Sequence, residues 1–229
     1  MSRTQVPVTA RASSICAILC AAAFVVTAVL VILGRVTASD THGIVAVRTL
    51  ASPGLTTVML AASLVAHGTL AIPLALLLAV LIYRVDGRDD ALLYVGACLI
   101  GEALHLTLKA LIRHHRPVGI SPKLTDAGWY SFPSGHAMLA VIIFGLGAVL
   151  ATRPAPRVVR VLAVGSAMLV VVLVGISRVY LGAHWPSDVI GAVFAGVAWS
   201  AACLAWDARR APRRPVMSSS SIQSPYSAA

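Results

Sequence analysis

Residues 13–34 read SSICAILCAAAFVVTAVLVILG, a run of 22 residues without a single charged side chain. A helix needs about 20 consecutive apolar residues to cross the hydrocarbon core of a bilayer. The apolar core of a secretory signal peptide is shorter, about 7–15 residues. We therefore expect residues 13–34 to be retained as a first membrane span.

Five further apolar runs follow, separated by clusters of charge: residues 55–83 (with Pro73 as a candidate kink), 91–112, 135–152, 158–176 and 186–206. The sequence thus predicts an all-α fold, a six-transmembrane-helix bundle formed by residues 13–207 as one domain. Residues 1–12 would be a cytoplasmic N-terminus. Residues 208–229, basic and then rich in serine, would be a disordered cytoplasmic tail.

The composition agrees with a membrane protein. Of the 229 residues, 59% are hydrophobic and 11% are charged, whereas an average soluble domain carries about 25% charged residues. The mean hydropathy of +0.89 excludes a disordered chain and a coiled coil. The net charge of +10 is expected to reflect basic cytoplasmic flanks and an anionic substrate, with no nucleic acid as partner.

Six spans place both termini on the same side of the membrane. Eleven Lys and Arg residues would lie on that side and seven on the other. Because basic loops remain in the cytoplasm, we expect the termini to be cytoplasmic and the protein to be a multi-pass protein of the cell membrane. The oligomeric state is not predicted.

Polar residues gather in three segments at the opposite, non-cytoplasmic face, where the bilayer makes them costly. The first segment is KALIRHHRP, residues 109–117, at the end of the third span. Lys109 and Arg116 are two helical turns apart and point the same way if the helix persists until Pro117. Basic side chains that snorkel to the interface explain this segment equally well.

The second segment is PSGH, residues 133–136, directly before the fourth apolar run. Proline suits the first turn of a helix, and Gly135 lets a ligand approach the backbone. Free amides at a helix N-terminus bind phosphate oxygens. Ser134 adds a hydroxyl donor, and His136 can exchange a proton near neutral pH. A turn followed by an N-cap is the simpler alternative.

The third segment is SRVYLGAHWPSD, residues 177–188. His184 and Asp188 are four residues apart around Pro186, which can open the sixth span. A carboxylate at that spacing can accept the proton of one imidazole nitrogen and leave the other nitrogen as a nucleophile. Taken alone, a capping aspartate beside an interfacial histidine explains the segment equally well.

Together the three segments supply three cations, helix-terminal amides and two histidines, of which one has a carboxylate at helical spacing. Cations and amides suit the oxygens of a phosphoryl group in transfer. The carboxylate-oriented histidine can attack phosphorus, while the other histidine protonates the leaving oxygen.

The pattern K-x6-RP, PSGH and SR-x5-H-x3-D, spread over residues 109–188, resembles the signature of the type 2 phosphatidic acid phosphatase superfamily. The resemblance implies that His184 forms a phosphohistidine, Asp188 orients it and His136 is the acid. It also implies a set of phosphate-holding residues and no metal or other cofactor; this set is Lys109, Arg116, Ser134, Gly135 and Arg178. Soluble vanadium-dependent haloperoxidases share these motifs, but the composition excludes a soluble member.

Other polar residues carry weaker signals. Glu102 and His105 precede Lys109 on the same helix face and either line a substrate channel or form a satisfied buried pair. His114 and His115 are poor metal ligands as a pair, because adjacent residues on a helix face apart. His67, inside the second run, is left without a role.

The sequence therefore predicts a membrane phosphatase that acts on a lipid phosphate or diphosphate at the non-cytoplasmic face. Isoprenoid diphosphates, phosphatidic acid and phosphatidylglycerol phosphate remain open as substrates. One alternative is a phosphotransferase that passes the phosphoryl group to a sugar or lipid hydroxyl. A channel with an anion filter is a weaker alternative, because a pore has no need of an aspartate four residues after a histidine.

Overall fold

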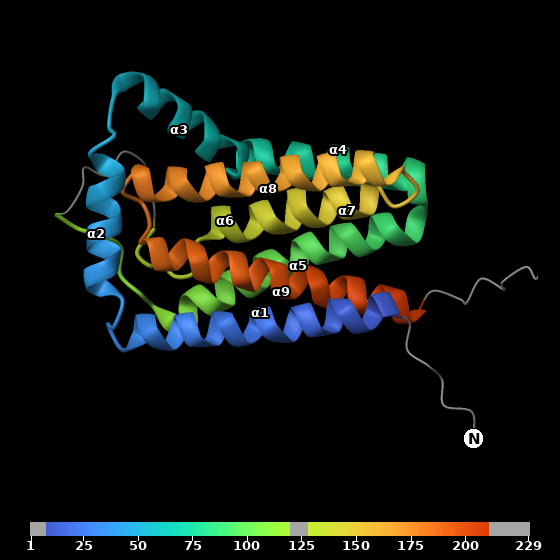
Figure 1. Cartoon of the computed structure of the whole chain (residues 1–229), viewed down its shortest axis with the longest axis horizontal. Coiled ribbons are helices and arrows are strands. Elements are labelled where there is room, and N and C mark those ends of the chain that lie inside the picture. The colour runs from blue at the N-terminus through green and yellow to red at the C-terminus, as the bar shows by residue number, and fades with distance from the viewer. Residues whose placement is uncertain (1–7, 120–127, 211–229) are drawn as a thin grey trace, which may run out of the picture.

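The computed structural model describes residues 8–119 and 128–210, and in these ranges the chain is helical with no strand. This confirms the all-α prediction. Most helices lie side by side along one axis, and the start of α1 and the end of α9 meet at the same end of the bundle (Figure 1). Most of the predicted N-terminal segment and nearly all of the predicted tail lie outside the described residues.

Five described helices are long and apolar enough to cross a membrane: α1 (Val8–Ile32), α4 (Gly68–Asp86), α5 (Arg88–Ile112), α8 (Arg157–Tyr180) and α9 (Pro186–Arg210). Two shorter apolar stretches accompany them. One is α3 (Pro53–Val65), and the other is the run of α6 (Gly135–Ala140), the π-helical η1 (Val141–Leu146) and α7 (Gly147–Ala151). The chain is a multi-pass membrane protein.

The second predicted span is broken at its middle, so the prediction of one helix kinked at Pro73 is wrong. Helix α3 ends at Val65, and α4 begins at Gly68. His67 has an extended backbone, and its Nδ1 accepts a hydrogen bond from the Thr69 backbone N–H at 3.4 Å. A polar side chain that caps a new helix start explains why the break lies here. Pro73 lies within the continuous α4.

A helix that the sequence analysis missed, α2 (Thr37–Arg48), crosses one end of the bundle (Figure 1). It packs closely on α9, because a Cβ atom at Gly43 would lie 2.8 Å from Cγ of Pro186. The buried Asp40 accepts hydrogen bonds from the backbone N–H of Ser187 at 2.9 Å and from its hydroxyl at 2.6 Å. These bonds fix the first turn of α9.

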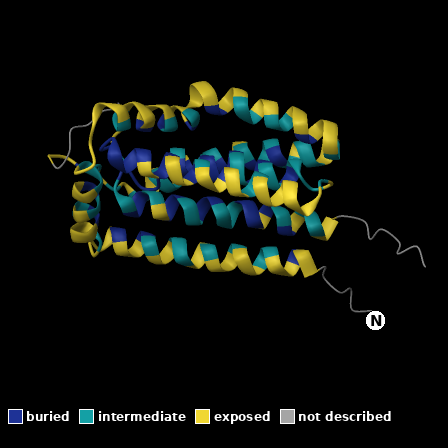
Figure 2. Cartoon of the chain, turned by 45° about the horizontal axis from the view of Figure 1, so that its top comes forward, coloured by how far each residue is buried: buried dark blue, intermediate teal, exposed yellow. Residues whose placement is uncertain are grey.

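The core lies around the central run from α6 to α7, where buried residues concentrate (Figure 2). Its inward face repeats every four residues, as an α-helical stripe does: Met138, Ile142, Leu146 and Leu150, each at most 1% exposed. The Tyr94 hydroxyl donates to Ile143 O at 3.1 Å, so one carbonyl of the π-helical segment is paired by a side chain. The outer helices expose apolar side chains, as expected next to lipid.

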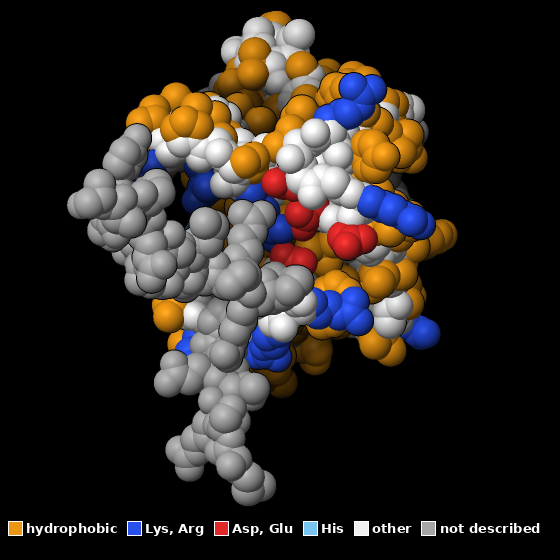
Figure 3. All heavy atoms as spheres, turned by 90° about the vertical axis from the view of Figure 1, so that its right-hand side faces the viewer, with side chains coloured by type: hydrophobic (Ala, Val, Ile, Leu, Met, Phe, Trp, Pro, Cys, Tyr) orange, Lys and Arg blue, Asp and Glu red, His pale blue; other side chains and the backbone are white. Residues whose placement is uncertain are grey.

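Charged groups join the helices at the end where α1 begins and α9 ends. Arg153 donates to the carboxylates of Asp90 on α5 and Asp207 on α9. Figure 3 shows this end, where Lys and Arg side chains stand around a smaller group of acidic side chains. The histidine-containing loops lie at the other end of the bundle.

We expect Asp40→Ala to lower the apparent thermal unfolding midpoint in detergent. The substitution leaves the N–H and hydroxyl of the buried Ser187 without their acceptor, which costs about 1–3 kcal/mol. Ser39→Ala, on an exposed position of the same helix, is the matched control and should not change the midpoint. Equal midpoints for the two variants would contradict this account of the α2–α9 contact.

Candidate active site

His184 and Asp188 meet at the start of α9. The Nδ1–H of His184 donates to Oδ2 of Asp188 at 3.3 Å, and the backbone N–H of Trp185 donates to the same oxygen at 2.9 Å. The two side chains are 2% and 0% exposed. A carboxylate that accepts from Nδ1 fixes the tautomer of the ring, so the lone pair lies on Nε2.

The guanidinium of Arg116 faces this lone pair. Its Nη1 donates to Nε2 of His184 at 3.1 Å and to the carbonyl of Ala183, while its Nε donates to Gly128 O at 2.6 Å. Two carbonyl acceptors thus hold the cation against the imidazole. A planar guanidinium with several donors is well suited to phosphoryl oxygens.

Burial lowers the pKa of His184 from 6.5 to about 4, although Asp188 acts in the opposite direction. A folded-state pKa below the ordinary value means that the ring loses its proton more readily than in water. At pH 7 the imidazole is therefore neutral, which is the form that can act as a nucleophile.

The PSGH segment lies beside this pair. The backbone N–H of Ser134 donates to the carbonyl of Asp188 at 3.1 Å, which ties the start of α6 to the start of α9. The titratable groups near His136 are Arg178, His184, His67 and Lys109. The ring of His67, across the α3–α4 break, lies 5.9 Å from the ring of His136. The structure thus brings the second and third sequence segments together.

The remaining predicted cations lie around the same point. Arg178 is 3% exposed near the end of α8, and its Nη1 donates to the hydroxyl of Ser63. Lys109, half-buried near the end of α5, has Arg116, Asp188 and Arg178 among its charged neighbours. All eight predicted site residues therefore lie at one end of the bundle.

Buried polar side-chain atoms without a hydrogen-bond partner among the described residues also gather here. Four of the six such atoms belong to this region: Nε2 of His105, Oγ of Ser134, Nε2 of His136 and Nε of Arg178. Most buried polar groups in proteins are paired. A cluster of buried polar atoms without a partner is a reason to look for a binding site here.

Glu102 and His105 form a pair that packs against the PSGH segment. Nδ1 of His105 lies 3.2 Å from Oε2 of Glu102. The imidazole lies over Gly135, since a Cβ atom added there would be 2.5 Å from Cε1 and 2.7 Å from Nε2 of His105. Glycine is required at this position because the ring fills the space that any side chain would need.

The predicted third span, residues 91–112, ends where α5 ends. The helix does not continue to Pro117, so the condition under which Lys109 and Arg116 would share one helix face is not met. The helix ends at Ile112, and Arg113 adopts a left-handed conformation with φ of 54°. The Nε of Arg113 donates to Ala110 O at 2.9 Å and so satisfies a carbonyl of the last helical turn. Arg116 reaches the site from an extended segment instead.

Sequence reasoning missed His114. Its Nδ1–H donates to Oδ1 of Asp188 at 3.1 Å, so that each carboxylate oxygen accepts from one histidine. His115 turns the other way and faces Tyr130, with ring centroids 6.0 Å apart. The sequence signal for His114 was its place between Lys109 and Arg116. A helix continued to Pro117 would have placed its side chain on a different face from these two cations.

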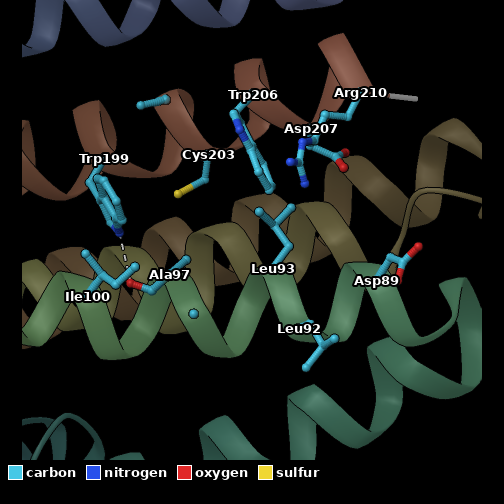
Figure 4. Close-up of a pocket in the computed structure, with 12 residues that line it drawn as sticks. Asp89, Leu92, Leu93, Ala97, Ile100, Trp199, Cys203, Trp206, Asp207 and Arg210 are labelled. Carbon is cyan, nitrogen blue, oxygen red and sulfur yellow. Dashed lines mark hydrogen bonds between the residues drawn. The ribbon is translucent and has the colours of Figure 1, made fainter. Parts of the chain in front are cut away.

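Two cavities lie at opposite ends of the bundle. The one beside the histidines, about 470 Å³, is lined by Lys109, His115, Arg116, Gly128, Trp129 and Tyr130. A larger one, about 700 Å³, lies between α5 and α9 and is mainly apolar, with Asp89, Asp207 and Arg210 at one end (Figure 4). The smaller cavity is lined by Lys109 and Arg116 and therefore adjoins the predicted site, whereas no predicted site residue lines the larger cavity. No cluster of three His, Cys, Asp or Glu residues suited to a metal occurs in the described parts of the chain.

A family model described as the PAP2 superfamily matches residues 90–212. The undecaprenyl-diphosphatase of Sulfolobus acidocaldarius is 45% identical over 71 residues, 31% of this chain and 29% of that protein. Phosphatidylglycerophosphatase B of Bacillus subtilis is 33% identical over 114 residues, 47% of this chain and 53% of that protein. The matched regions thus span at most about half the length of these curated relatives.

A solved structure is similar over nearly the whole fold. The crystal structure of a transmembrane PAP2-type phosphatidylglycerolphosphate phosphatase from Bacillus subtilis superposes with a TM-score of 0.79 and 25% identity. The superposition covers 86% of this chain and 98% of that one. The structure of LpxE from Aquifex aeolicus, with a TM-score of 0.56 and 20% identity, shares the fold.

We expect Gly135→Ala to destabilise the protein, because the new methyl group collides with the His105 ring; overpacking of this kind costs about 1–3 kcal/mol. The double variant Gly135→Ala/His105→Ala should recover most of the loss in a thermal unfolding assay. Gly165→Ala is the control, since no atom lies within 4 Å of the added Cβ there. A double variant as unstable as Gly135→Ala alone would show that the collision is not the cause.

Proposed function

The chain belongs to the PAP2 superfamily, and on this basis we propose that it is a membrane phosphatase that hydrolyses a lipid phosphate or diphosphate. One observation carries the proposal: His184 contacts Asp188 through one ring nitrogen and Arg116 through the other. The names of two relatives, an undecaprenyl-diphosphatase and a phosphatidylglycerophosphatase B, support a lipid-linked substrate. Isoprenoid diphosphates, phosphatidic acid and phosphatidylglycerol phosphate are the candidates.

In the first step Nε2 of His184 attacks phosphorus. A P–N bond forms while the P–O bond to the leaving group breaks, and His136 gives its proton to the leaving oxygen. The leaving group is the lipid alcohol of a phosphate or the lipid monophosphate of a diphosphate. Asp188 stabilises the positive charge that develops on the His184 ring. The Arg116 guanidinium, which donates to Nε2 in the structure, moves to a phosphoryl oxygen as that nitrogen becomes bonded.

In the second step water replaces His184. His136, now without its proton, accepts one from the water as the P–O bond forms and the P–N bond breaks, which releases inorganic phosphate. Transfer to a sugar or lipid hydroxyl would use the same intermediate. An assay of phosphate release against a labelled acceptor separates the two outcomes.

The charge that the reaction needs comes from side chains. Lys109, Arg116 and Arg178 would bind the phosphoryl oxygens together with the Ser134 hydroxyl and the Gly135 amide. Three fixed cations perform the role that a divalent metal has in many phosphoryl-transfer enzymes. We therefore predict that the activity does not depend on metal ions and that it survives treatment with a chelator.

The proposal includes six spans, formed by α1, α3 with α4, α5, the run from α6 to α7, α8 and α9. Basic residues at the chain ends and in the α7–α8 connection support cytoplasmic termini, although part of the counted charge lies outside the described residues. The active site would then face the non-cytoplasmic side of the cell membrane.

We expect different losses from the two histidines in a screen of phosphate release over a panel of lipid phosphates. His184→Ala should abolish turnover and leave no labelled protein after incubation with a phosphate-labelled substrate. His136→Ala should slow turnover about 100- to 10,000-fold, and less so when p-nitrophenolate is the leaving group, since it hardly needs a proton. Phosphate trapped on His136, or substantial activity of His184→Ala, would contradict the mechanism.

The orientation predicts which introduced cysteines react in intact cells. The four native cysteines, all free thiols, are first replaced by alanine and the activity of that background is checked. Val118→Cys, at a position 85% exposed near the site, should react with an impermeant maleimide. Pro156→Cys, in the exposed α7–α8 connection, should react only after permeabilisation. The reverse pattern would invert the proposed topology.

A further inference from the structure

We propose that His114 is a positioning residue that holds the Asp188 carboxylate in place and thereby acts on His184. This inference rests on the proposed function, since it concerns the same site. It assigns a role to a histidine that lies between the two cations of the first segment, at a position that the three-part signature leaves unspecified.

Asp188 is held by hydrogen bonds to both of its carboxylate oxygens. Its side chain is completely buried, and it accepts three of them in the described structure. Oδ2 accepts from Nδ1 of His184 and from the N–H of Trp185, whereas Oδ1 accepts from Nδ1 of His114 at 3.1 Å. Without His114, Oδ1 would be buried with no described donor, and a buried unpaired carboxylate oxygen is costly.

The backbone holds His114 where this contact needs it. The left-handed turn at Arg113 ends α5 and redirects the chain. Ser131 then fixes the backbone of His114. The backbone N–H of Ser131 donates to His114 O at 2.7 Å, and the Ser131 hydroxyl donates to the same carbonyl at 3.0 Å. The ring of Trp185 lies beside the imidazole, with centroids 6.2 Å apart. The imidazole is therefore held in position before any substrate binds.

The carboxylate links the two rings. Oδ1 and Oδ2 belong to one planar group, so a donor that fixes Oδ1 also fixes the direction in which Oδ2 meets Nδ1 of His184. Loss of the Oδ1 donor frees the carboxylate to rotate, and the orientation of the attacking nitrogen becomes less defined. Such a loss should lower kcat and leave substrate binding by the cations unchanged.

The test compares substitutions that differ in where they place an N–H. Asparagine presents its amide near the position of Nδ1, whereas glutamine presents it near the position of Nε2. We expect His114→Ala and His114→Gln to lower kcat about 10- to 100-fold, the size of loss that follows at metal sites when a hydrogen-bond partner one step removed from the reacting centre is lost. His114→Asn should recover most of the activity. KM should change little in all three variants.

A second measurement separates positioning from a structural role. In an Asp188→Asn background, His114→Ala should cause no further loss of the residual turnover, since its effect passes through the carboxylate. His42→Ala, an exposed histidine on α2, is the control, and thermal unfolding is measured for every variant. Equal activities of His114→Asn and His114→Gln, wild-type activity of His114→Ala, or an undiminished loss in the Asp188→Asn background would each overturn the inference.

The same variants distinguish failure of the proposed function from failure of the role assigned to His114. If His184→Ala retains activity, the proposed function itself fails. If His184→Ala is inactive while His114→Ala turns over at the wild-type rate, the phosphatase proposal stands and only the role of His114 is rejected.

Discussion

A carboxylate buried without solvent must be surrounded by donors, and Asp188 meets this condition with groups from separate parts of the chain. His184 and Trp185 come from the α8–α9 connection, and His114 comes from the segment after α5. The backbone of Asp188 in turn accepts from Ser134 at the start of α6. One buried residue therefore bonds, through its carboxylate and its backbone, to three chain segments that meet at this end of the bundle.

The sequence patterns predicted the contacts and helix starts that depend on residues close together in the chain. A histidine and an aspartate four residues apart around Pro186 meet because Pro186 starts α9 and the turn directly before it brings His184 back to the first turn of that helix. PSGH precedes a helix because its residues suit a helix start. The apolar runs gave the membrane-spanning segments in outline. The same reasoning failed where a backbone conformation was not visible in the pattern, as at Arg113, whose left-handed turn ends α5 four residues before Pro117.

Contacts between distant segments leave no periodic pattern in the sequence. The other features that were not predicted depend on such contacts. Asp40 bonds to Ser187, 147 residues later, and the helix that carries it is too short to be recognised as a span. His114 bonds to Asp188, 74 residues later. His67 was left without a role because its position beside His136 depends on a break in the second apolar run.

Around the site, the described basic side chains outnumber the carboxylates that could neutralise them, which favours the binding of an anion. Lys109, Arg116 and Arg178 lie near one another, while Asp188, the one completely buried carboxylate among the described residues here, already accepts from three donors. Burial lowers the pKa of Arg116, the direction expected when a cation is removed from water. Like charges held together in a low dielectric repel one another, and an anion with several oxygens relieves that repulsion when it binds. Burial of Arg178 and the two carbonyl contacts of Arg116 hold these cations beside the site beforehand. Only the short shift of Arg116 from Nε2 of His184 to a phosphoryl oxygen is then needed, and this preorganisation contributes to catalysis in the mechanism proposed here.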